Sequence, residues 1–502
     1  MAIQPVFENI RIRAEKGSFS EKIKVDCKTD VESSSVAEAI GVTARVLRGE
    51  CSCEDGKIVY AGKAVFYFFY ENADGNLCKR ECSEDFEGSI TAENVSPDCV
   101  CDAEFITERA EINGSGIKIS LSANVIIKAE VSCYEEVEAL SGGSGMFVKA
   151  TETSVPKSYG VKKTTLPVEQ QFSFDYPVKE VLCHRADAVV TAVQCGVGCI
   201  IADGEIYCSA MVLQKDGKSG IIREDVTIPF RAEIDCEEAM PVANARAEAS
   251  VGTFKTDITV DAENGKSEVL ISVGLRISGE AFGNEEVSLV DDAFCLKNEL
   301  ELSSECRDVR YVEGLFCEKY AVTGRAGISE VPSASKVVAV CGERAEIISL
   351  STEDDKVVVD GVLSATVFLL TEEGKMLSIK ADAPFNTHLE TQCGSKMQKV
   401  SVLAENARAR LISLTELEIE ADMIFCSQCV DKKTIKCIRS VGEGCEKPVC
   451  DSAISIFIPI EGEDLWSISK RLGADPEKLT ETNPDLSFPL TGRERIAVYR
   501  QR

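Results

Sequence analysis

The chain has 502 residues, which is too long for one ordinary domain and predicts three or four. Its composition, 44% apolar and 28% charged, is that of a globular protein with enough apolar side chains to build buried cores. The net charge of −29, from 84 acidic and 55 basic residues, opposes contact with nucleic acid or anionic lipid, so we expect no nucleic-acid partner.

The N-terminal residues Met1 to Glu8 lack the basic flank and the apolar stretch of a secretory signal, so export by that route is not expected. The longest apolar run, Ala64 to Tyr70, is far shorter than the roughly 20 residues of a membrane helix and predicts a buried strand. We therefore expect no transmembrane segment. The 23 cysteines are scattered along the chain, which indicates free, mostly buried thiols in a reducing cytosol.

One pattern of turn, strand, turn and strand occurs three times, about 150 residues apart, which is the spacing of whole domains. The copies cover residues 55–82, 203–230 and 354–379, with turns at Asp55-Gly56 and Asp74-Gly75, at Asp203-Gly204 and Asp216-Gly217, and at Asp354-Asp355 and Glu373-Gly374.

A second β-hairpin follows each copy. These hairpins cover residues 101–131 with a turn at Asn113-Gly114-Ser115-Gly116, residues 245–277 with a turn near Asn264-Gly265, and residues 406–425. Val269, Ile271, Val273, Leu275 and Ile277 alternate strictly, as in an antiparallel sheet with one buried face. The expected fold is mainly β, with three tandem antiparallel β-sandwich or barrel-like domains.

The segments between the copies predict the domain boundaries. Residues 141–145 and the stretch around 157–160 are rich in glycine and serine and indicate a flexible joint. Residues 291–317 and 430–451 indicate less regular connectors. We therefore expect β-rich domains at 1–145, 146–312 and 313–450, and a small C-terminal domain at 451–502.

Cysteine spacing offers one weak metal candidate. Cys426 and Cys429 form a C-x-x-C pair followed by Cys437, Cys445 and Cys450, but the later spacings are irregular and no histidine is near. Zinc at this position is the lesser alternative, and we expect no metal and no cofactor.

Three other pairs of cysteines favour structural roles. The glycines between Cys195 and Cys199 predict a turn between strands, and zinc there is the lesser alternative. Cys51 and Cys53 are alternate residues of one predicted strand, as are Cys99 and Cys101, so the two thiols of each pair lie on the same face. We expect these thiols to pack together, and oxidation is the alternative.

The sequence offers no catalytic constellation. The two histidines, His184 and His388, lie in different repeats at positions that do not correspond. No phosphate-binding loop, nucleophile elbow or His-Glu-x-x-His pair occurs. We expect a protein that is not an enzyme.

The C-terminal residues have a different pattern. A short strand at 454–459 precedes a helix with Leu465, Ile468 and Leu472 on one face, for which Asp464 is the expected N-cap. Asp475 and Pro476 predict the start of a second helix, and a final strand covers residues 495–499. Trp466, the only tryptophan, is expected in the core of this βααβ unit.

These residues resemble a LysM domain. The matching elements are Gly462, the run from Asp464 to Ile468, Leu479, Asn483-Pro484, and Leu490 with Gly492. Asp464 stands where the family usually has a hydroxyl residue, and Tyr499 replaces a proline. The resemblance implies a groove for N-acetylglucosamine-containing glycans or a partner between two loops, made here of Gly462, Glu463, Asp464 and Leu465, and of Asn483, Pro484, Asp485 and Leu486.

Repeated β-rich domains followed by one such module resemble the spore coat morphogenetic proteins of the SipL type. The resemblance implies a non-catalytic adaptor in the mother-cell cytosol, which links a coat-assembling ATPase of the SpoIVA type to the forespore surface or spore coat. The β domains would supply docking or self-association surfaces, and several weak contacts would add. The alternative is a cell-wall protein that binds peptidoglycan. An enzyme would need a site formed between repeats.

Overall fold

The computed structural model describes residues 3–113, 117–215, 220–260, 265–329, 331–332, 335–353, 356–390, 397–447 and 454–499. The described chain is mainly β, with 79% strand and 4% helix. Its sheets are antiparallel and none of those described is closed, so they are open sheets rather than the barrels that were one expected form.

Three sets of six strands follow one another along the chain. Unit 1 contains β1 (Gln4–Glu32), β2 (Glu38–Glu54), β3 (Lys57–Glu71), β4 (Leu77–Thr91), β5 (Val100–Asn113) and β6 (Lys118–Ser144), with a short 3-10 helix at Ser33–Ser35. Unit 2 contains β7 (Phe147–Phe174), β8 (Val178–Cys195), β9 (Cys199–Gln214), β10 (Ile221–Asp235), β11 (Asn244–Val260) and β12 (Ser267–Phe294). Unit 3 contains β13 (Asn298–Gly327), β14 (Lys336–Glu353), β15 (Lys356–Leu370), β16 (Met376–Leu389), β17 (Met397–Ser413) and β18 (Glu416–Glu446).

All three units have the same topology. In each, the first, sixth and fifth strands form one three-stranded sheet, and the second, third and fourth form another. The two sheets face each other over an apolar core, which in unit 1 joins Val25 and Leu121 of one sheet to Phe66 and Phe68 of the other. This arrangement explains the pattern that occurs three times in the sequence. Its first long strand is the middle strand of the sheet formed by the second, third and fourth strands of each unit, which is β3, β9 or β15.

Several turns that the sequence predicts are present. Gly75 and Gly374 close their hairpins with φ of 75° and 79°, a conformation that glycine adopts without strain. The turn predicted at Asp203-Gly204 was wrong, because both residues lie inside β9 and pair with β8 and β10 on either side. Of the other expected turns, residues 114–116, 216–217, 264 and 354–355 lie outside the described residues.

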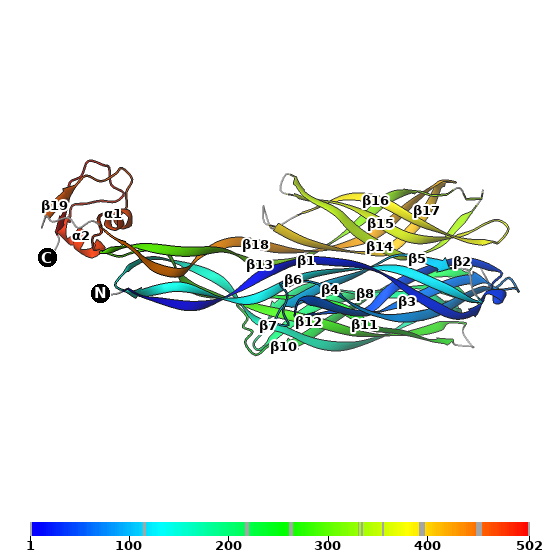
Figure 1. Cartoon of the computed structure of the whole chain (residues 1–502). Helices are drawn as coiled ribbons and strands as arrows, with labels where there is room; N and C mark the ends of the chain where they lie inside the picture. The colour runs from blue at the N-terminus through cyan, green and yellow to red at the C-terminus, as the bar shows by residue number, and fades with distance from the viewer. Residues whose placement is uncertain are drawn as a thin grey trace.

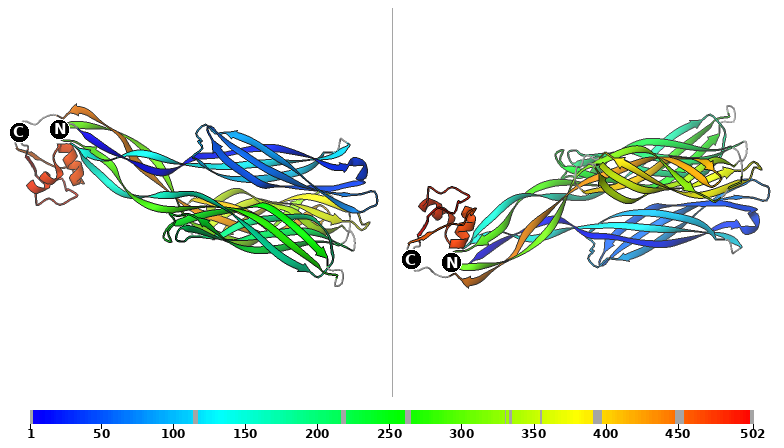
Figure 2. Two further views of the ribbon diagram at one scale, coloured as in Figure 1. Left: turned by 90° about the horizontal axis from the view of Figure 1, so that it is seen from below. Right: turned by 90° about the horizontal axis from the view of Figure 1, so that it is seen from above.

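The run from Ala64 to Tyr70 lies in β3, and the prediction of a buried strand is confirmed for Ala64 to Phe69, which are buried on both faces. Phe66 and Phe68 face the core of unit 1, whereas Val65, Tyr67 and Phe69 face the other two units. The apolar cluster that contains these three side chains joins the sheets formed by the second, third and fourth strands of all three units. The units therefore form one body, visible in Figures 1 and 2.

The outer parts of the longest strands leave the body as three twisted ribbons, β1 with β6, β7 with β12, and β13 with β18 (Figure 1). We call this part, residues 4–15, 132–158, 282–310 and 433–446, the stalk. Its core contains one fully buried residue from the first strand of each unit, Ile12, Val155 and Val309. Packing of the three ribbons against one another thus replaces the second sheet that each ribbon lacks here.

The stalk corrects the expected joints and connectors. Residues 141–144 pair with the start of β1, residues 157–160 lie in β7, and residues 298–317 and 430–446 lie in β13 and β18. The boundary expected at 312 falls inside β13, while the chain passes between units at residues 145–146 and 295–297. A narrow ribbon exposes much of both faces to solvent, so its sequence lacks the strict alternation that identifies a sandwich strand.

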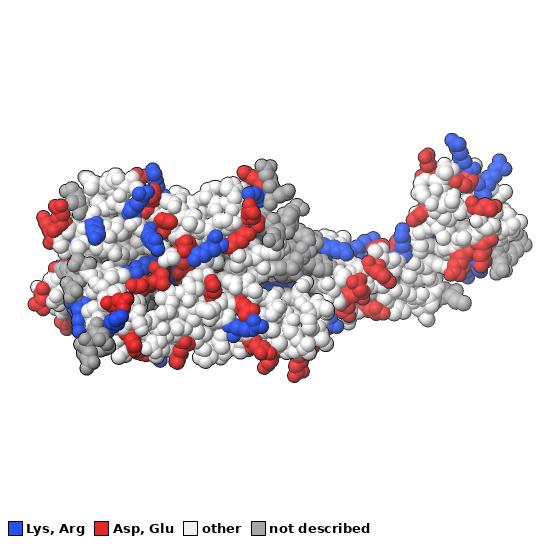
Figure 3. Space-filling view, turned by 180° about the vertical axis from the view of Figure 1, so that it is seen from behind, with Lys and Arg blue, Asp and Glu red and all other residues white. Residues whose placement is uncertain are grey.

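The charge is distributed over the surface. On the face shown in Figure 3, acidic and basic side chains are interspersed over the body and the stalk rather than gathered in one field. No helix in the described ranges is both long and apolar enough to cross a membrane.

Candidate functional site

The chain ends in a small module at the tip of the stalk (Figure 1), which we call the tip module. It contains β19 (Ile454–Phe457), α1 (Leu465–Leu472), α2 (Pro476–Thr482) and β20 (Ile496–Tyr499). Asp464 caps α1 by accepting a hydrogen bond of 2.7 Å from the backbone N–H of Ser467, and Asp475 caps α2, with Pro476 in its first turn. The predicted order of strands and helices and both predicted caps are confirmed.

The core of the tip module does not contain Trp466. Its buried residues are Ile468, Leu472, Ala474, Leu479, Leu490, Ile496 and Val498. Helical spacing explains the difference, because Trp466 lies two residues before Ile468 and therefore on another side of α1. The prediction that this residue fills the core was wrong.

Trp466 instead fastens the tip module to the stalk. Its ring meets the ring of Phe294 edge to face with centroids 4.9 Å apart, and its Nε1 donates to Oδ2 of Asp292 at 2.9 Å. Lys470, one turn further along α1, donates to both oxygens of the same carboxylate at 2.6 and 2.7 Å. Burial raises the pKa of Asp292, but the hydrogen bonds from Lys470 and Trp466 outweigh it and the net shift is downward.

Two lysines complete this contact. Lys447, just after β18, donates to the carbonyl oxygens of Cys295 at 2.9 Å and Lys470 at 3.4 Å. Lys149 of β7 pairs with Asp464 at 3.4 Å, but both side chains are about half exposed and the pair contributes little. The contact is therefore centred on the aromatic pair and the Asp292 carboxylate.

The loop before α1 has its polar groups engaged inside the module. Glu463 accepts from Arg471 at 2.8 and 2.9 Å and from the backbone N–H of Ile460 at 2.7 Å. The hydrogen bond from Arg471 lowers the pKa of Glu463. Gly462 has a φ of 88° and open space beside its α-carbon, and Leu465 packs against the core.

The loop after α2 is built around Asn483. Its Nδ2 donates to the carbonyl oxygens of Leu479 and Ala497, each at 2.8 Å, and its Oδ1 accepts from the Ala497 N–H at 2.8 Å. This side chain therefore ties α2 to β20. Pro484 and Asp485 are exposed, and Leu486 packs against the same core as the first loop.

Leu490 is held against the first predicted loop by two backbone hydrogen bonds. Its carbonyl accepts from Gly462 N–H at 2.8 Å, and its own N–H donates to the Glu463 carbonyl at 2.9 Å. The eight residues predicted from the resemblance thus lie around one small core, although Glu463, Asp464 and Asn483 use their side chains for internal hydrogen bonds.

A row of exposed isoleucines is a feature of this module that the sequence reasoning missed. Ile454, Ile456, Ile458 and Ile460 are between 54% and 70% exposed, whereas Phe457 and Pro459 turn inward. The strict alternation of isoleucine from residue 454 to residue 460 could have indicated this surface, but the sequence analysis used it only to predict a strand. Large apolar side chains gathered on one surface are typical of a protein contact.

The cysteines contradict the zinc alternative at Cys426. That residue forms a disulfide with Cys317, its partner across β13 and β18, so the expectation of free thiols was wrong for these two cysteines. Cys437 lies eleven residues further along the same strand, about 36 Å away at the usual rise, so these residues cannot share an ion. Cys450 lies outside the described residues, and no group of metal ligands occurs among those described.

The other singled-out cysteines have structural surroundings. Cys195 ends β8 and Cys199 begins β9, so the predicted turn between them is confirmed. The two pairs in unit 1 are free thiols packed, together with Cys133, around one apolar cluster; they are Cys51, Cys53, Cys99 and Cys101.

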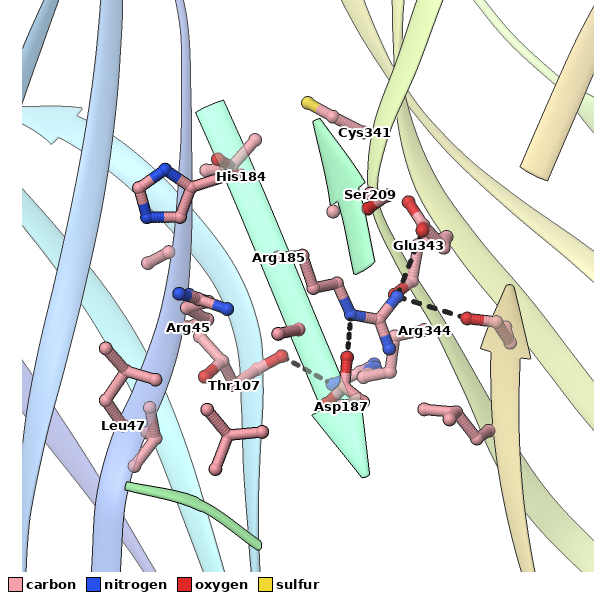
Figure 4. A pocket seen from close by; sticks show the side chains of 18 of the residues that line it. Arg45, Leu47, Thr107, His184, Arg185, Asp187, Ser209, Cys341, Glu343 and Arg344 are labelled. Atoms are coloured by element: carbon pink, nitrogen blue, oxygen red, sulfur yellow. Dashed lines mark hydrogen bonds and ion pairs between the residues drawn. The ribbon is translucent and has the colours of Figure 1, made fainter. Parts of the chain in front are cut away.

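A second candidate site lies in the body, where the three units meet. The second strand of each unit, β2, β8 and β14, and the fifth, β5, β11 and β17, line a cavity of about 440 Å³ (Figure 4). Arg344 donates to the carbonyl of Thr107 at 2.8 Å and so joins unit 3 to unit 1.

Two arginines of unit 2 reach across this cavity to unit 3. Arg223 pairs with Glu343 at 2.8 Å and Arg185 with the same carboxylate at 3.1 Å, and the Glu343 side chain is only 1% exposed. Burial raises the pKa of Glu343, but the two arginines outweigh it and the net shift is downward. Glu405 is also buried, and burial raises its pKa to about 8. The ion pairs of Arg185 and Arg223 with Glu343 hold unit 2 and unit 3 together.

The two histidines occupy unrelated positions. His184 lines the cavity, where its ring meets the rings of Phe254 and Tyr67 edge to face at 4.7 and 5.6 Å. Burial, followed by the charges of Arg45 and Lys79, lowers the pKa of His184 to about 3, so its imidazole is neutral. His388 is exposed on β16.

Comparison with known proteins adds no relative. Neither family models, curated proteins nor solved structures match this chain.

Proposed function

We propose that this chain is a non-catalytic adaptor: three tandem β domains that hold a C-terminal LysM domain at a distance from the body, as in spore coat morphogenetic proteins of the SipL type. In this proposal the LysM domain, residues 451–502, binds a coat-assembling ATPase of the SpoIVA type. The protein would act in the mother-cell cytosol, at the forespore surface or spore coat. The observation that carries the proposal is the fixed docking of the tip module at the end of the stalk by Trp466.

A protein partner is favoured over a glycan by the chemistry of the module surface. Sugar recognition needs polar groups free to exchange hydrogen bonds, yet Glu463, Asp464 and Asn483 already use theirs internally. The exposed isoleucines offer an apolar surface instead. Burying one isoleucine side chain contributes about 1.5–3 kcal/mol, so a few such contacts give useful affinity.

The test is capture of the purified ATPase by the full-length chain. Replacing Ile456 and Ile458 by serine should weaken binding more than tenfold, because each loses its apolar contact. Val242, which is exposed on unit 2, gives the matched control Val242→Ser, and this variant should bind normally.

Peptidoglycan fragments provide the opposing arm of the experiment. Saturable binding of fragments, with no capture of the ATPase, would support the cell-wall alternative and refute the adaptor. A fluorescent reporter in sporulating cells adds a second readout, and a signal outside the mother cell contradicts the proposal.

A further inference from the structure

Arg45 differs from the other arginines that line the central cavity. Arg185, Arg223 and Arg344 each pair with a carboxylate. Within the described ranges Arg45 has no acidic partner, and its Nε and Nη2 are buried without a hydrogen bond. In Figure 4 it projects from β2 toward the strand that carries His184, and no dashed line reaches it. Its guanidinium lies over the Phe254 ring, 5.7 Å from the centroid, so an aromatic face rather than an acid offsets the charge of Arg45 among the described residues.

The hydroxyl of Tyr67 is a second unused donor in this cavity. Tyr67 is 3% exposed and lines the same space, and its buried Oη, beside the Arg45 guanidinium, has no acceptor for its proton among the described residues. Burial raises the pKa of Tyr67 more than the neighbouring Arg45 charge lowers it, so the O–H remains a donor at neutral pH. Buried donors are nearly always paired in folded proteins, yet the Tyr67 O–H and the Nε and Nη2 of Arg45 have no acceptor in good hydrogen-bond geometry among the described residues.

The remaining walls suit a small organic molecule. The volume of about 440 Å³ is within the range of small-molecule sites. Leu47, Phe105 and Val251 supply apolar surface, and the exposed residues Ala103 and Glu104 show that the cavity reaches the surface.

We propose that this cavity binds a small organic anion, with a carboxylate or phosphate group on Arg45 and Tyr67 and a short apolar body against the aliphatic walls. The guanidinium fork matches the oxygens of either group. Arg45 and Tyr67 belong to unit 1 and His184 to unit 2, so the ligand would bridge two units. The inference is independent of what the tip module binds.

Calorimetric titration of the full chain with benzoate and with phenyl phosphate tests the proposal, and the two probes distinguish the carboxylate from the phosphate. At least one should bind saturably, and benzyl alcohol, which lacks the charge, should bind at least tenfold more weakly. Arg45→Met should weaken the anion at least tenfold, and Tyr67→Phe should weaken it severalfold. Arg231→Met, which removes an exposed arginine of unit 2, should leave the affinity unchanged.

Several results would overturn the inference. These are no binding of either anion, equal binding of benzyl alcohol, or unchanged affinity in Arg45→Met. If Arg45→Met does not fold, Arg45→Lys keeps the charge and should bind measurably. A crystal grown with the tighter anion should show it within hydrogen-bond distance of Arg45, and density only elsewhere refutes the site.

Discussion

The contact between the tip module and the stalk can be tested by replacing Asp292 with alanine. Its carboxylate accepts hydrogen bonds from Trp466 and Lys470. A hydrogen bond to a charged group contributes about 1.5–3 kcal/mol, and the partial exposure of Lys470 reduces its share. We therefore expect a loss of about 2 kcal/mol in docking free energy, roughly a thirtyfold shift toward the undocked module.

The assay is direct because Trp466 is the only tryptophan. Its fluorescence emission should move to longer wavelength in Asp292→Ala, as the indole leaves Phe294 and enters water. The matched control is Asp291→Ala, since the Asp291 side chain accepts from Thr151 rather than from the tip module. Unchanged emission in Asp292→Ala, or an equal change in Asp291→Ala, would refute the docking account.

Acid should release the same contact. The pKa of Asp292 is lower when docked than the ordinary value of 3.8, so its contribution is present above that value and is lost as the pH falls through the docked pKa. The emission shift should therefore appear below about pH 4 in the unmodified chain. In Asp292→Ala, the change in emission over this pH range should be much smaller.

Three further predictions concern the module core, the body and the disulfide. Asn483→Ala should destabilise the tip module by about 1–3 kcal/mol, because buried backbone groups lose their partners, and limited proteolysis should detect this while the exposed control Asp485→Ala behaves normally. Glu343→Gln should lower the free energy of unfolding by about 3–5 kcal/mol in urea titrations, since two buried arginines lose their shared carboxylate, and a loss below 1 kcal/mol would contradict the ion pairs. Peptide mapping should find Cys317 linked to Cys426, and reduction should cost up to about 5 kcal/mol for the 109-residue separation; an unlinked pair in oxidised protein would contradict the structure.

The strands of the body could be predicted because one face of each sheet is buried. Val269 to Ile277 shows the alternation of such a strand, and every second residue is buried in the structure. The run in β3 was predicted as buried, but its second buried face depends on contacts with other units, which period-two reasoning does not reveal. The stalk was missed for the same reason, because its core forms only between ribbons distant in sequence.

In the tip module, too, features that depend on neighbouring residues could be predicted, and features that depend on residues far away in the sequence could not. Its caps follow from Asp464 and Asp475, whose effects are confined to one helical turn. The role of Trp466 depends on Asp292 and Phe294, which lie more than 170 residues earlier in the chain. The unpaired charge of Arg45 could not be predicted either, because it is defined by the absence of an acid among neighbours from several strands.

The path of the chain through the stalk has a practical consequence. Gln4 begins the first ribbon at the tip, and the chain returns there after every unit, so both of its ends lie beside the tip module (Figure 1). A fluorescent protein fused to either end would lie close to the exposed isoleucines of the tip module and interfere with the interaction that it is meant to report. The turn at Asn72–Asn76 lies at the opposite end of the body, and an insertion there would leave the tip unobstructed.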